Sequence, residues 1–251
     1  MRIRAGIATA CAAAAVASGG AAAQSTVPRI GPRISGYVTV MSDYRNRGLS
    51  QSGGDPAVLL GADYQHGSGF FAGARAANVE YAVPAPDGSA RHAEAALYAG
   101  YSRRFRRWSV TGSVGRYTYP GSDYDWDYGE VGASIGFRDR VFLTASWTDD
   151  FFNVGAHALS HELAVALPVG AGFEVGAGIG RFRSSGIDVD YTHWNAGASK
   201  RIGRFGIDLR YYDSSHDAGR YGTVQPRRML PGAPSDGEWV LSVSRGFDAG
   251  S

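Results

Sequence analysis

Residues 130–137 read Glu-Val-Gly-Ala-Ser-Ile-Gly-Phe, and residues 173–180 read Phe-Glu-Val-Gly-Ala-Gly-Ile-Gly. In both stretches every second residue is apolar, and the residues between are glycine, serine or glutamate. Successive side chains of a β-strand point to opposite faces of the sheet. Each stretch therefore predicts a strand with one apolar face and one small or polar face.

The same alternation recurs along the whole chain in about twelve segments. Most of them run for roughly 10–12 residues, which is the length that a tilted strand needs to cross a bilayer. Residues 157–167 also carry apolar side chains at helical spacing, but we expect a strand there because the neighbouring segments are strands. The predicted strands begin near Ile34, Ala57, Phe70, His92, Trp108, Tyr128, Val141, Ala158, Phe173, Thr192, Phe205 and Trp239.

The connections between these segments alternate between short and long. The short ones are residues 66–69, 102–107, 138–140, 168–172 and 201–204, and the long ones are 48–55, 81–90, 120–127, 149–155, 184–191 and 213–237. Short turns on one side and long loops on the other are typical of outer-membrane barrels, whose short turns face the periplasm. The charges divide in the same way, with Arg103, Arg104, Arg106, Arg107, Arg138, Arg140, Lys200, Arg201 and Arg204 in the short turns and Asp123, Asp125, Asp127, Asp149, Asp150, Asp188 and Asp190 in the long loops.

The composition excludes several classes of protein. Of 251 residues, 44% are hydrophobic and 12% aromatic, which is too much apolar surface for a disordered chain. The 25 basic residues nearly balance the 23 acidic ones, and Arg2 and Arg4 supply the whole excess. A chain without basic excess lacks the charge that drives nucleic-acid binding, so we expect no nucleic-acid partner.

The N-terminus has the pattern of an export signal. A short basic region is followed by apolar residues 7–17 and by an Ala-x-Ala cleavage site at residues 21–23. We therefore predict a signal peptide over residues 1–23, a periplasmic segment over 24–33 and a barrel over 34–251. The one cysteine, Cys11, lies in the predicted signal, so the mature chain has no disulfide and no thiol nucleophile.

Alternation alone fits either a secreted soluble β-protein or a transmembrane barrel. The second is favoured because the polar face is rich in Gly, Ser and Thr, and because Lys200 is the chain's one lysine. Aromatic residues also gather near the segment ends, where the interfacial girdles of membrane barrels lie. These residues are Tyr44, Tyr64, Tyr81, Tyr101, Trp108, Tyr119, Trp147, Tyr191, Tyr211, Trp239 and Phe247. The predicted fold is an all-β, antiparallel up-and-down barrel of about twelve strands in a Gram-negative outer membrane.

Residues 42–51, Ser-Asp-Tyr-Arg-Asn-Arg-Gly-Leu-Ser-Gln, resemble the N-terminal signature of the TorF family of porin-like outer-membrane proteins. Weaker likenesses follow at residues 55–57, 69–73, 98–101, 117–121, 194–197 and 210–213. The resemblance implies an outer-membrane barrel. The chain departs from the usual barrel ending, because four residues follow Phe247 and Arg245 stands where an aromatic residue is usual.

Charged residues on the polar face are the candidates for a lumen that sorts solutes by charge and width. In the first segment, Asp43, Arg45 and Arg47 are expected on one face of a strand, opposite Val38, Val40 and Tyr44. The full set is Asp43, Arg45, Arg47, Asp63, Arg75, Glu94, Glu130, Glu162, Asp208 and Arg210. The alternative is that these charges pair with one another, fill a narrow barrel and leave no pore.

Other motifs are weaker. His157 and His161 are spaced as helical metal ligands but would lie about 13 Å apart on a strand. Ser160 and His161 would point to opposite faces, so they do not form a nucleophile and base. Alternate glycines at 176, 178 and 180 lack the spacing of a nucleotide loop, and we expect them to leave room in the lumen or to relieve curvature. Prolines 226, 231 and 234 in the last loop are expected in a surface loop or in a constriction.

The leading prediction is a porin-like channel for passive diffusion of small polar solutes or ions. A non-conducting structural or surface-interaction barrel is the alternative, and a lipid-modifying enzyme is third. We expect no metal and no cofactor. The expected partners are outer-membrane lipid and lipopolysaccharide, the barrel assembly machinery and periplasmic chaperones.

Overall fold

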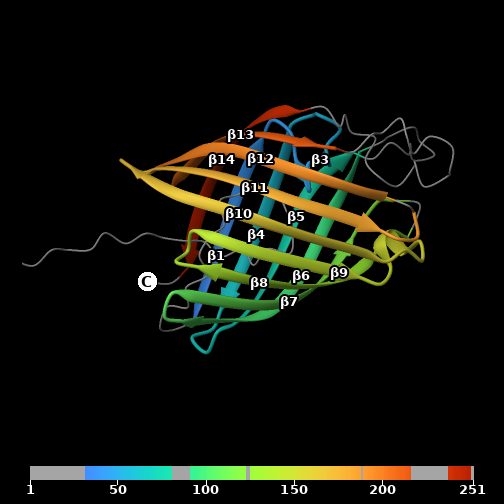
Figure 1. Ribbon diagram of the computed structural model, residues 1–251, viewed down its shortest axis with the longest axis horizontal. Helices are drawn as coiled ribbons and strands as arrows, with labels where there is room; N and C mark the ends of the chain where they lie inside the picture. The colour runs from blue at the N-terminus through green and yellow to red at the C-terminus, as the bar shows by residue number, and fades with distance from the viewer. Residues whose placement is uncertain (1–31, 81–90, 123–124, 188, 216–236, 250–251) are drawn as a thin grey trace, which may run out of the picture.

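Each predicted segment forms a strand, and twelve strands close into one antiparallel barrel (Figure 1). The computed structural model describes residues 32–80, 91–122, 125–187, 189–215 and 237–249. The barrel strands are β1 (Arg33–Met41), β4 (Ala57–Gln65), β5 (Phe70–Glu80), β6 (Arg91–Phe105), β7 (Trp108–Thr118), β8 (Tyr128–Phe137), β9 (Val141–Thr148), β10 (Ala158–Gly170), β11 (Phe173–Ser184), β12 (Val189–Ile202), β13 (Phe205–Ser214) and β14 (Glu238–Ala249). The 3₁₀ turn η1 (Phe151–Asn153) and a small two-stranded sheet, β2 (Arg45–Asn46) with β3 (Leu49–Ser50), complete the described elements.

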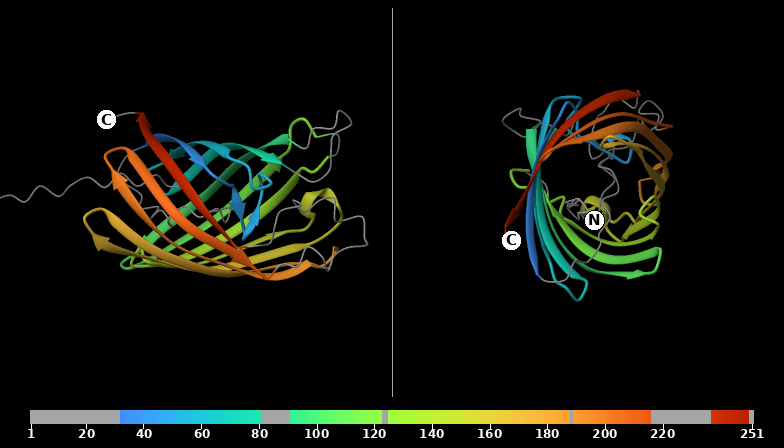
Figure 2. Two further views of the ribbon diagram at one scale, coloured as in Figure 1. Left: turned by 90° about the horizontal axis from the view of Figure 1, so that it is seen from above. Right: turned by 90° about the vertical axis from the view of Figure 1, so that its left-hand side faces the viewer.

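Strands that follow one another in sequence pair with one another, and β1 closes the ring by pairing with both β4 and β14. Val38 lies opposite Leu60 on one side and Arg245 on the other. The end-on view of Figure 2 shows the closed ring. The predicted strand number is confirmed, and so is the strand over residues 157–167, which lies in β10.

Some predicted turns are shorter than expected. β6 continues to Phe105, so residues 102–105 belong to the wall, and β10 continues to Gly170. β12 begins at Val189, three residues before the predicted Thr192. The predicted signal peptide and the prolines at 226, 231 and 234 lie outside the described residues.

The outward face of the barrel is apolar. Large side chains stand exposed along the strands, among them Leu97 at 67%, Ile179 at 55% and Trp239 at 58%. A band of this kind around the barrel requires lipid as its solvent, while the polar residues between point inward. The barrel is therefore transmembrane. Among the described residues no helix combines the length and the hydrophobicity needed to span a bilayer.

The expected aromatic girdles are confirmed in part. Trp108, Trp147 and Trp239 are exposed on the outer surface, as are Tyr64, Tyr101 and Phe247. Three expected girdle residues are instead buried inside the barrel: Tyr44 is 3% exposed, Tyr119 5% and Tyr191 4%. Tyr191 lies on the inward face of its strand, and Tyr44 and Tyr119 lie in segments beyond the strand ends, so a position near a segment end did not predict a lipid-facing ring. Tyr81 lies outside the described residues.

Inward-facing glycines give room to aromatic rings of neighbouring strands. A Cβ added at Gly61 would lie 2.3 Å from the ring of Tyr37, and one added at Gly136 would lie 2.9 Å from the ring of Phe142. Each of these glycines therefore lies directly against an aromatic ring of the neighbouring strand.

Candidate functional site

The segment after β1 folds into the barrel. β1 ends at Met41, and Asp43–Ser52, which we call the inner hairpin, contains β2 and β3. Its residues contact inward-facing side chains of strands on opposite sides of the barrel, from Glu94 of β6 to His193 of β12. The prediction that Asp43, Arg45 and Arg47 line one face of a wall strand is therefore wrong. Their inward direction is retained, but they reach the lumen from a hairpin inside it.

Local backbone chemistry explains why the chain turns here. Arg47 and Gly48 have positive φ angles of 51° and 80°, and Asn46 pairs with Leu49 across them. Positive φ at both central residues is the property of a type I′ hairpin turn, which favours glycine at the second position. Asn46-Arg47-Gly48 therefore reverses the chain between β2 and β3, inside the barrel.

The tip of the inner hairpin is anchored on the far wall by a buried ion pair. Nη2 of Arg47 donates to Oε2 of Glu130 on β8 at 2.6 Å and to Oγ of Ser146 on β9 at 2.9 Å. Its guanidinium also lies 5.3 Å from the ring centre of Phe182 on β11. Burial lowers the pKa of Arg47, but Glu130, Tyr128 and Tyr117 together raise it more, so the net shift of the pKa is upward. The guanidinium stays charged in place.

Gly48 makes the closest contact between this tip and the wall. A Cβ added to Gly48 would lie 2.7 Å from Cβ of His193, 3.1 Å from the carbonyl oxygen of Asp213 and 3.2 Å from Cβ of Ser214. These residues belong to β12 and β13, which lie four and three places from β4 around the ring of twelve strands. The tip of the hairpin therefore rests against β12 and β13 without space for a side chain.

The base of the inner hairpin is held by Asp43. Its carboxylate accepts hydrogen bonds from Nε of Arg45 at 2.5 Å, from Oγ of Ser50 at 2.5 Å and from Oγ of Ser52 at 2.9 Å. Arg45 also donates to the carbonyl oxygen of Gly48 at 3.2 Å. All of these side chains are buried, so the hairpin carries its own charge pair and is internally satisfied before it meets the wall.

A second polar group ties the hairpin to β5 and β6. The carboxylate of Glu94 accepts from the hydroxyl groups of Tyr44 and Tyr119, each at 3.3 Å, and Nη2 of Arg75 lies 3.4 Å away. Burial raises the pKa of the Tyr44 hydroxyl, which therefore remains a donor. The guanidinium of Arg75 also stacks over the ring of Tyr117 at 5.3 Å.

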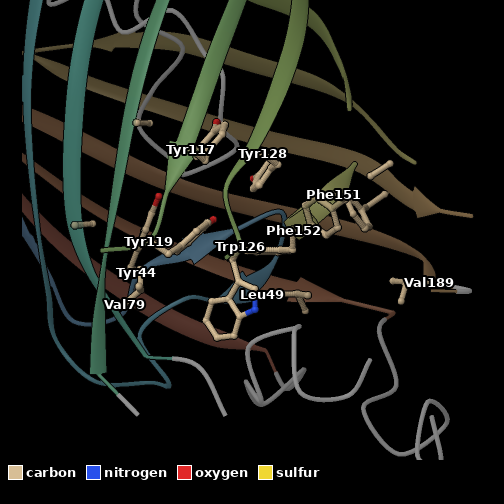
Figure 3. Packing of buried hydrophobic residues seen from close by; sticks show 14 of the residues in the cluster. Tyr44, Leu49, Val79, Tyr117, Tyr119, Trp126, Tyr128, Phe151, Phe152 and Val189 are labelled. Atoms are coloured by element: carbon tan, nitrogen blue, oxygen red, sulfur yellow. The ribbon is translucent and has the colours of Figure 1, made fainter. Parts of the chain in front are cut away.

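Aromatic side chains fill the rest of the loop-side half of the barrel (Figure 3). Phe151 and Phe152 of η1 lie 4.5 Å apart between ring centres, and Phe152 lies 5.3 Å from Tyr119. The buried cluster is Tyr44, Leu49, Ala57, Ala77, Val79, Ala96, Tyr117, Tyr119, Trp126, Tyr128, Phe151, Phe152, Ala158, Phe182, Val189 and Tyr191. The loop-side half thus has a packed interior, to which the inner hairpin belongs.

The turn-side half of the lumen is different. Several of its inward positions on β7, β8 and β9 are small and polar and keep part of their surface accessible, including Ser109, Thr111, Ser113, Ser134 and Thr144, while the inward side chain of Phe142 is buried. Across the ring, Ser242 and Ser244 of β14 are also partly accessible. The turn-side half, which we call the vestibule, thus keeps accessible hydroxyl groups, whereas the loop-side half is packed.

Polar side chains of β10 and β12 cluster over the inward glycines of β11, at the boundary between the two halves. A Cβ added to Gly178 would lie 2.8 Å from Nδ2 of Asn195 and 3.0 Å from Oε1 of Glu162, and one added to Gly180 would meet the His193 ring at 2.5 Å. The room that the sequence predicted at these glycines is thus occupied by side chains of β10 and β12. Nδ1 of His193 lies 3.9 Å from Oε2 of Glu162.

Arg210 adds a positive charge to this group of polar side chains. Nη1 of Arg210 donates to Oδ1 of Asn195 at 2.8 Å, and its Nη2 lies 3.2 Å from Asp208. On the other side of the lumen, Asp63 accepts a 2.5 Å hydrogen bond from the hydroxyl of Tyr98.

All ten candidate residues therefore lie inside the barrel. Eight form four acid–arginine pairs: Asp43 with Arg45, Glu130 with Arg47, Glu94 with Arg75 and Asp208 with Arg210. Asp63 and Glu162 are not ion-paired with an arginine in the described part of the chain. Six acids against four arginines give this set a net negative charge.

The candidate enzymatic residues do not converge. Ser160 is buried on the inward face of β10, whereas His161 is exposed on the outward face beside it. His157 stacks on Trp147 outside the barrel, with ring centres 6.3 Å apart. Among the described residues, no three His, Cys, Asp or Glu side chains lie close enough to hold a metal ion.

A family of bacterial proteins described as "Bacterial protein of unknown function (Gcw_chp)" matches residues 25–247. The chain belongs to this Gcw_chp family. The likeness of residues 42–51 to the TorF signature stays a resemblance, and within the Gcw_chp chain described here those residues build the inner hairpin. None of the curated protein sequences matches the chain.

Solved structures with a similar fold are outer-membrane barrels. The KdgM porin is 8% identical over 86% of this chain and 99% of that chain, with a TM-score of 0.51. The KdgM porin in complex with disordered oligogalacturonate gives 8%, the same coverages and a TM-score of 0.50. A chain from a study of the in-meso crystallization of membrane proteins is 9% identical over 86% of this chain and 83% of that chain, with a TM-score of 0.52. At these identities the likeness concerns the fold alone.

Proposed function

We propose that this Gcw_chp protein is an outer-membrane channel for small polar solutes and ions, with the inner hairpin as its gate. The observation that carries the proposal is the contrast between the two halves of the lumen. The turn-side half is lined by accessible hydroxyl groups, and a barrel interior of this kind is filled with water. The loop-side half is filled by the inner hairpin together with the aromatic cluster that packs around it, and the hairpin is a segment that the strands of the wall do not include.

The way in which the hairpin is held supports a gate. Its tip reaches the wall through one buried arginine and one glycine contact, while its own charge pair, Asp43 with Arg45, is carried along with it. Undocking of the hairpin therefore separates only the ion pair between Arg47 and Glu130. Both side chains regain solvation in a water-filled lumen. The wall strands keep all their mutual hydrogen bonds in either state.

Charge inside the lumen bears on selectivity. Asp63 and Glu162 are the candidate acids without an arginine partner, and they lie on opposite sides of the vestibule, on β4 and β10. Fixed negative charge in a narrow lumen favours cations. We propose that the open channel prefers cations to anions by a modest factor.

The channel is tested by recording currents from the refolded chain in planar bilayers, with a salt gradient across the membrane. Discrete, reproducible steps with a reversal potential on the cation side are the expected result. Folding is checked by the change in gel mobility between heated and unheated samples. A correctly folded chain that carries no current at any voltage, with the hairpin in place or removed, would overturn the proposal.

A non-conducting structural barrel is the second candidate, and one observation favours it. The aromatic cluster that includes η1 fills the loop-side half together with the hairpin, and such packing stabilises a closed state. The same recordings separate the two candidates, because a structural barrel stays silent even when the hairpin is removed.

A further inference from the structure

The short-turn end of the barrel, which we call the basic rim, concentrates positive charge. Eleven basic residues and three acids of the described chain lie there. The basic residues are Arg33, Arg103, Arg104, Arg106, Arg107, Arg138, Arg140, Lys200, Arg201, Arg204 and Arg245, and the acids are Asp139, Glu174 and Asp248. Two of the acids are paired, Asp139 with Arg104 and Asp248 with Arg33, so most of the positive charge is left without compensation.

Part of the basic rim stands on the outer surface of the barrel, above exposed aromatic rings. Arg103, Lys200 and Arg245 alternate with inward residues of their strands and so face outward. Each lies over an outward ring of the aromatic band: Arg103 over Phe105 at 5.1 Å, Lys200 over Phe173 at 4.2 Å, and Arg245 over Phe205 at 5.7 Å and Phe247 at 5.3 Å. Arg138, in the turn after β8, lies 5.3 Å from the ring centre of Phe137.

These contacts fix the height of the charges relative to the membrane. Aromatic bands of barrels lie at the level of the lipid headgroups. A cation held over the face of such a ring therefore lies at the same level of the membrane. Four cations on four aromatic sites therefore surround the barrel at headgroup level and point away from the lumen.

The opposite end of the barrel has no such surplus in its described part. Arg181 and Arg183 both pair with Asp190, at 2.7 and 3.0 Å, and Arg116 lies 3.5 Å from Asp127. The exposed arginines there are neutralised by the protein's own acids.

We propose that the basic rim binds the phosphate groups of anionic phospholipids in the adjoining leaflet, through outward cations seated on the aromatic band. Arginine suits this role because its planar fork of donors matches a phosphate, and ten of the eleven basic residues are arginine. A soluble periplasmic partner would approach along the barrel axis and meet the turns, whereas Arg103, Lys200 and Arg245 face sideways into the lipid. The partner that reaches them all is the headgroup layer itself.

The test is lipid retention. The chain is refolded in vesicles with equimolar phosphatidylglycerol and phosphatidylcholine, extracted gently, and its bound lipids are counted by native mass spectrometry. A basic residue near an anionic surface is worth about fivefold in lipid partitioning. We therefore expect phosphatidylglycerol to be enriched about fivefold or more, and the enrichment to fall as salt is raised before extraction.

A quadruple variant, Arg103→Gln with Arg138→Gln, Lys200→Gln and Arg245→Gln, should bring the bound lipids close to the equimolar ratio. The matched control is Arg181→Gln with Arg183→Gln at the other end, which should keep the enrichment. Excess inorganic phosphate should not displace the bound lipid, since a free anion lacks the anchoring acyl chains.

Equal retention of the two lipids by the unaltered chain would overturn the proposal, and so would full enrichment in a folded quadruple variant. Loss of enrichment in the control pair would show that overall charge, and not the rim, selects the lipid. Should the quadruple variant not refold, the salt series on the unaltered chain and the single variants Lys200→Gln and Arg245→Gln carry the same test. Channel activity enters none of these readouts, so this test of lipid binding is independent of the proposed channel function.

Discussion

Replacing Gly48 with alanine should undock the inner hairpin, and Gly54 supplies a matched control in the same loop. Gly48 has φ of 80° and Gly54 has φ of 87°, so alanine at either position carries the same left-handed backbone penalty of about 1 kcal/mol. They differ in space: an added Cβ at Gly48 would lie 2.7 Å from Cβ of His193, whereas at Gly54 nothing lies within 4 Å.

The clash at Gly48 sets the size of the effect. Forcing a methyl group into a packed contact costs about 1–3 kcal/mol when the surroundings cannot yield, and the carbonyl of Asp213 and Cβ of Ser214 hold this one on two further sides. Since 1.4 kcal/mol is a factor of ten, the ratio of undocked to docked hairpin should rise about 5- to 150-fold in Gly48→Ala relative to Gly54→Ala.

The assay is the open probability of single channels in planar bilayers, measured for both variants and for the unaltered chain. We expect Gly48→Ala to dwell longer in the conducting state, with a step size that does not shrink, while Gly54→Ala behaves as the unaltered chain does. Identical open probabilities in the two variants, both correctly folded, would refute the reasoning that the tip contact holds the channel closed.

Three further outcomes are expected. Arg47→Gln and Glu130→Gln should each destabilise docking of the hairpin by about 3–5 kcal/mol, because each leaves a buried charge unpaired. The double variant should lose less docking free energy than the sum of the two single variants. The loss is measured by titrating the protease resistance of the hairpin with urea. Glu162→Gln should move the reversal potential in a salt gradient toward that of anions, and an unchanged potential would mean that this carboxylate lies off the ion path. Leu97→Arg on the lipid face should cost about 2–4 kcal/mol and reduce the yield of refolded barrel, whereas Ser113→Arg in the lumen should refold normally; equal yields on a heat-modifiability gel would contradict the assignment of the two faces.

The fold follows from the sequence because a barrel repeats one simple pattern. Alternation along segments such as residues 130–137 is enforced at every strand by lipid outside and polar lumen inside, and twelve repeats leave little ambiguity in number. Short turns end where the alternation ends, within a few residues. The same reasoning placed all ten charged candidates inside the barrel, since charge facing lipid is costly wherever it occurs.

The alternation of apolar and polar residues did not predict the inner hairpin. Residues 43–47 continue the alternation of β1, so period alone extended the strand through them. The competing signal was Asn46-Arg47-Gly48, a short turn motif whose strength lies in two positive φ angles and not in hydrophobicity. Contacts between Arg47 and Glu130 join residues 83 apart in sequence, and no local pattern predicts such a partner.

The aromatic cluster was missed for a related reason. Phe151 and Phe152 stand in a predicted surface loop, and Tyr119 and Tyr191 stand near segment ends where girdle residues are common. Which way a loop folds depends on the space that other side chains leave, and here the inward glycines and serines leave that space in the barrel. The rings turn inward because this space is available to them. A ring buried there loses as much contact with water as one placed in the headgroup layer.

The central claim is that the inner hairpin, docked among the aromatic residues of the loop-side half, is the gate that closes the lumen. The most direct measurement is the single-channel current of a chain in which residues 43–52 are replaced by a short Gly-Ser linker, compared with the unaltered chain in the same bilayers. Our account predicts a folded barrel with stable, larger and rarely interrupted current steps. A folded, heat-modifiable barrel that stays silent without its hairpin would contradict it.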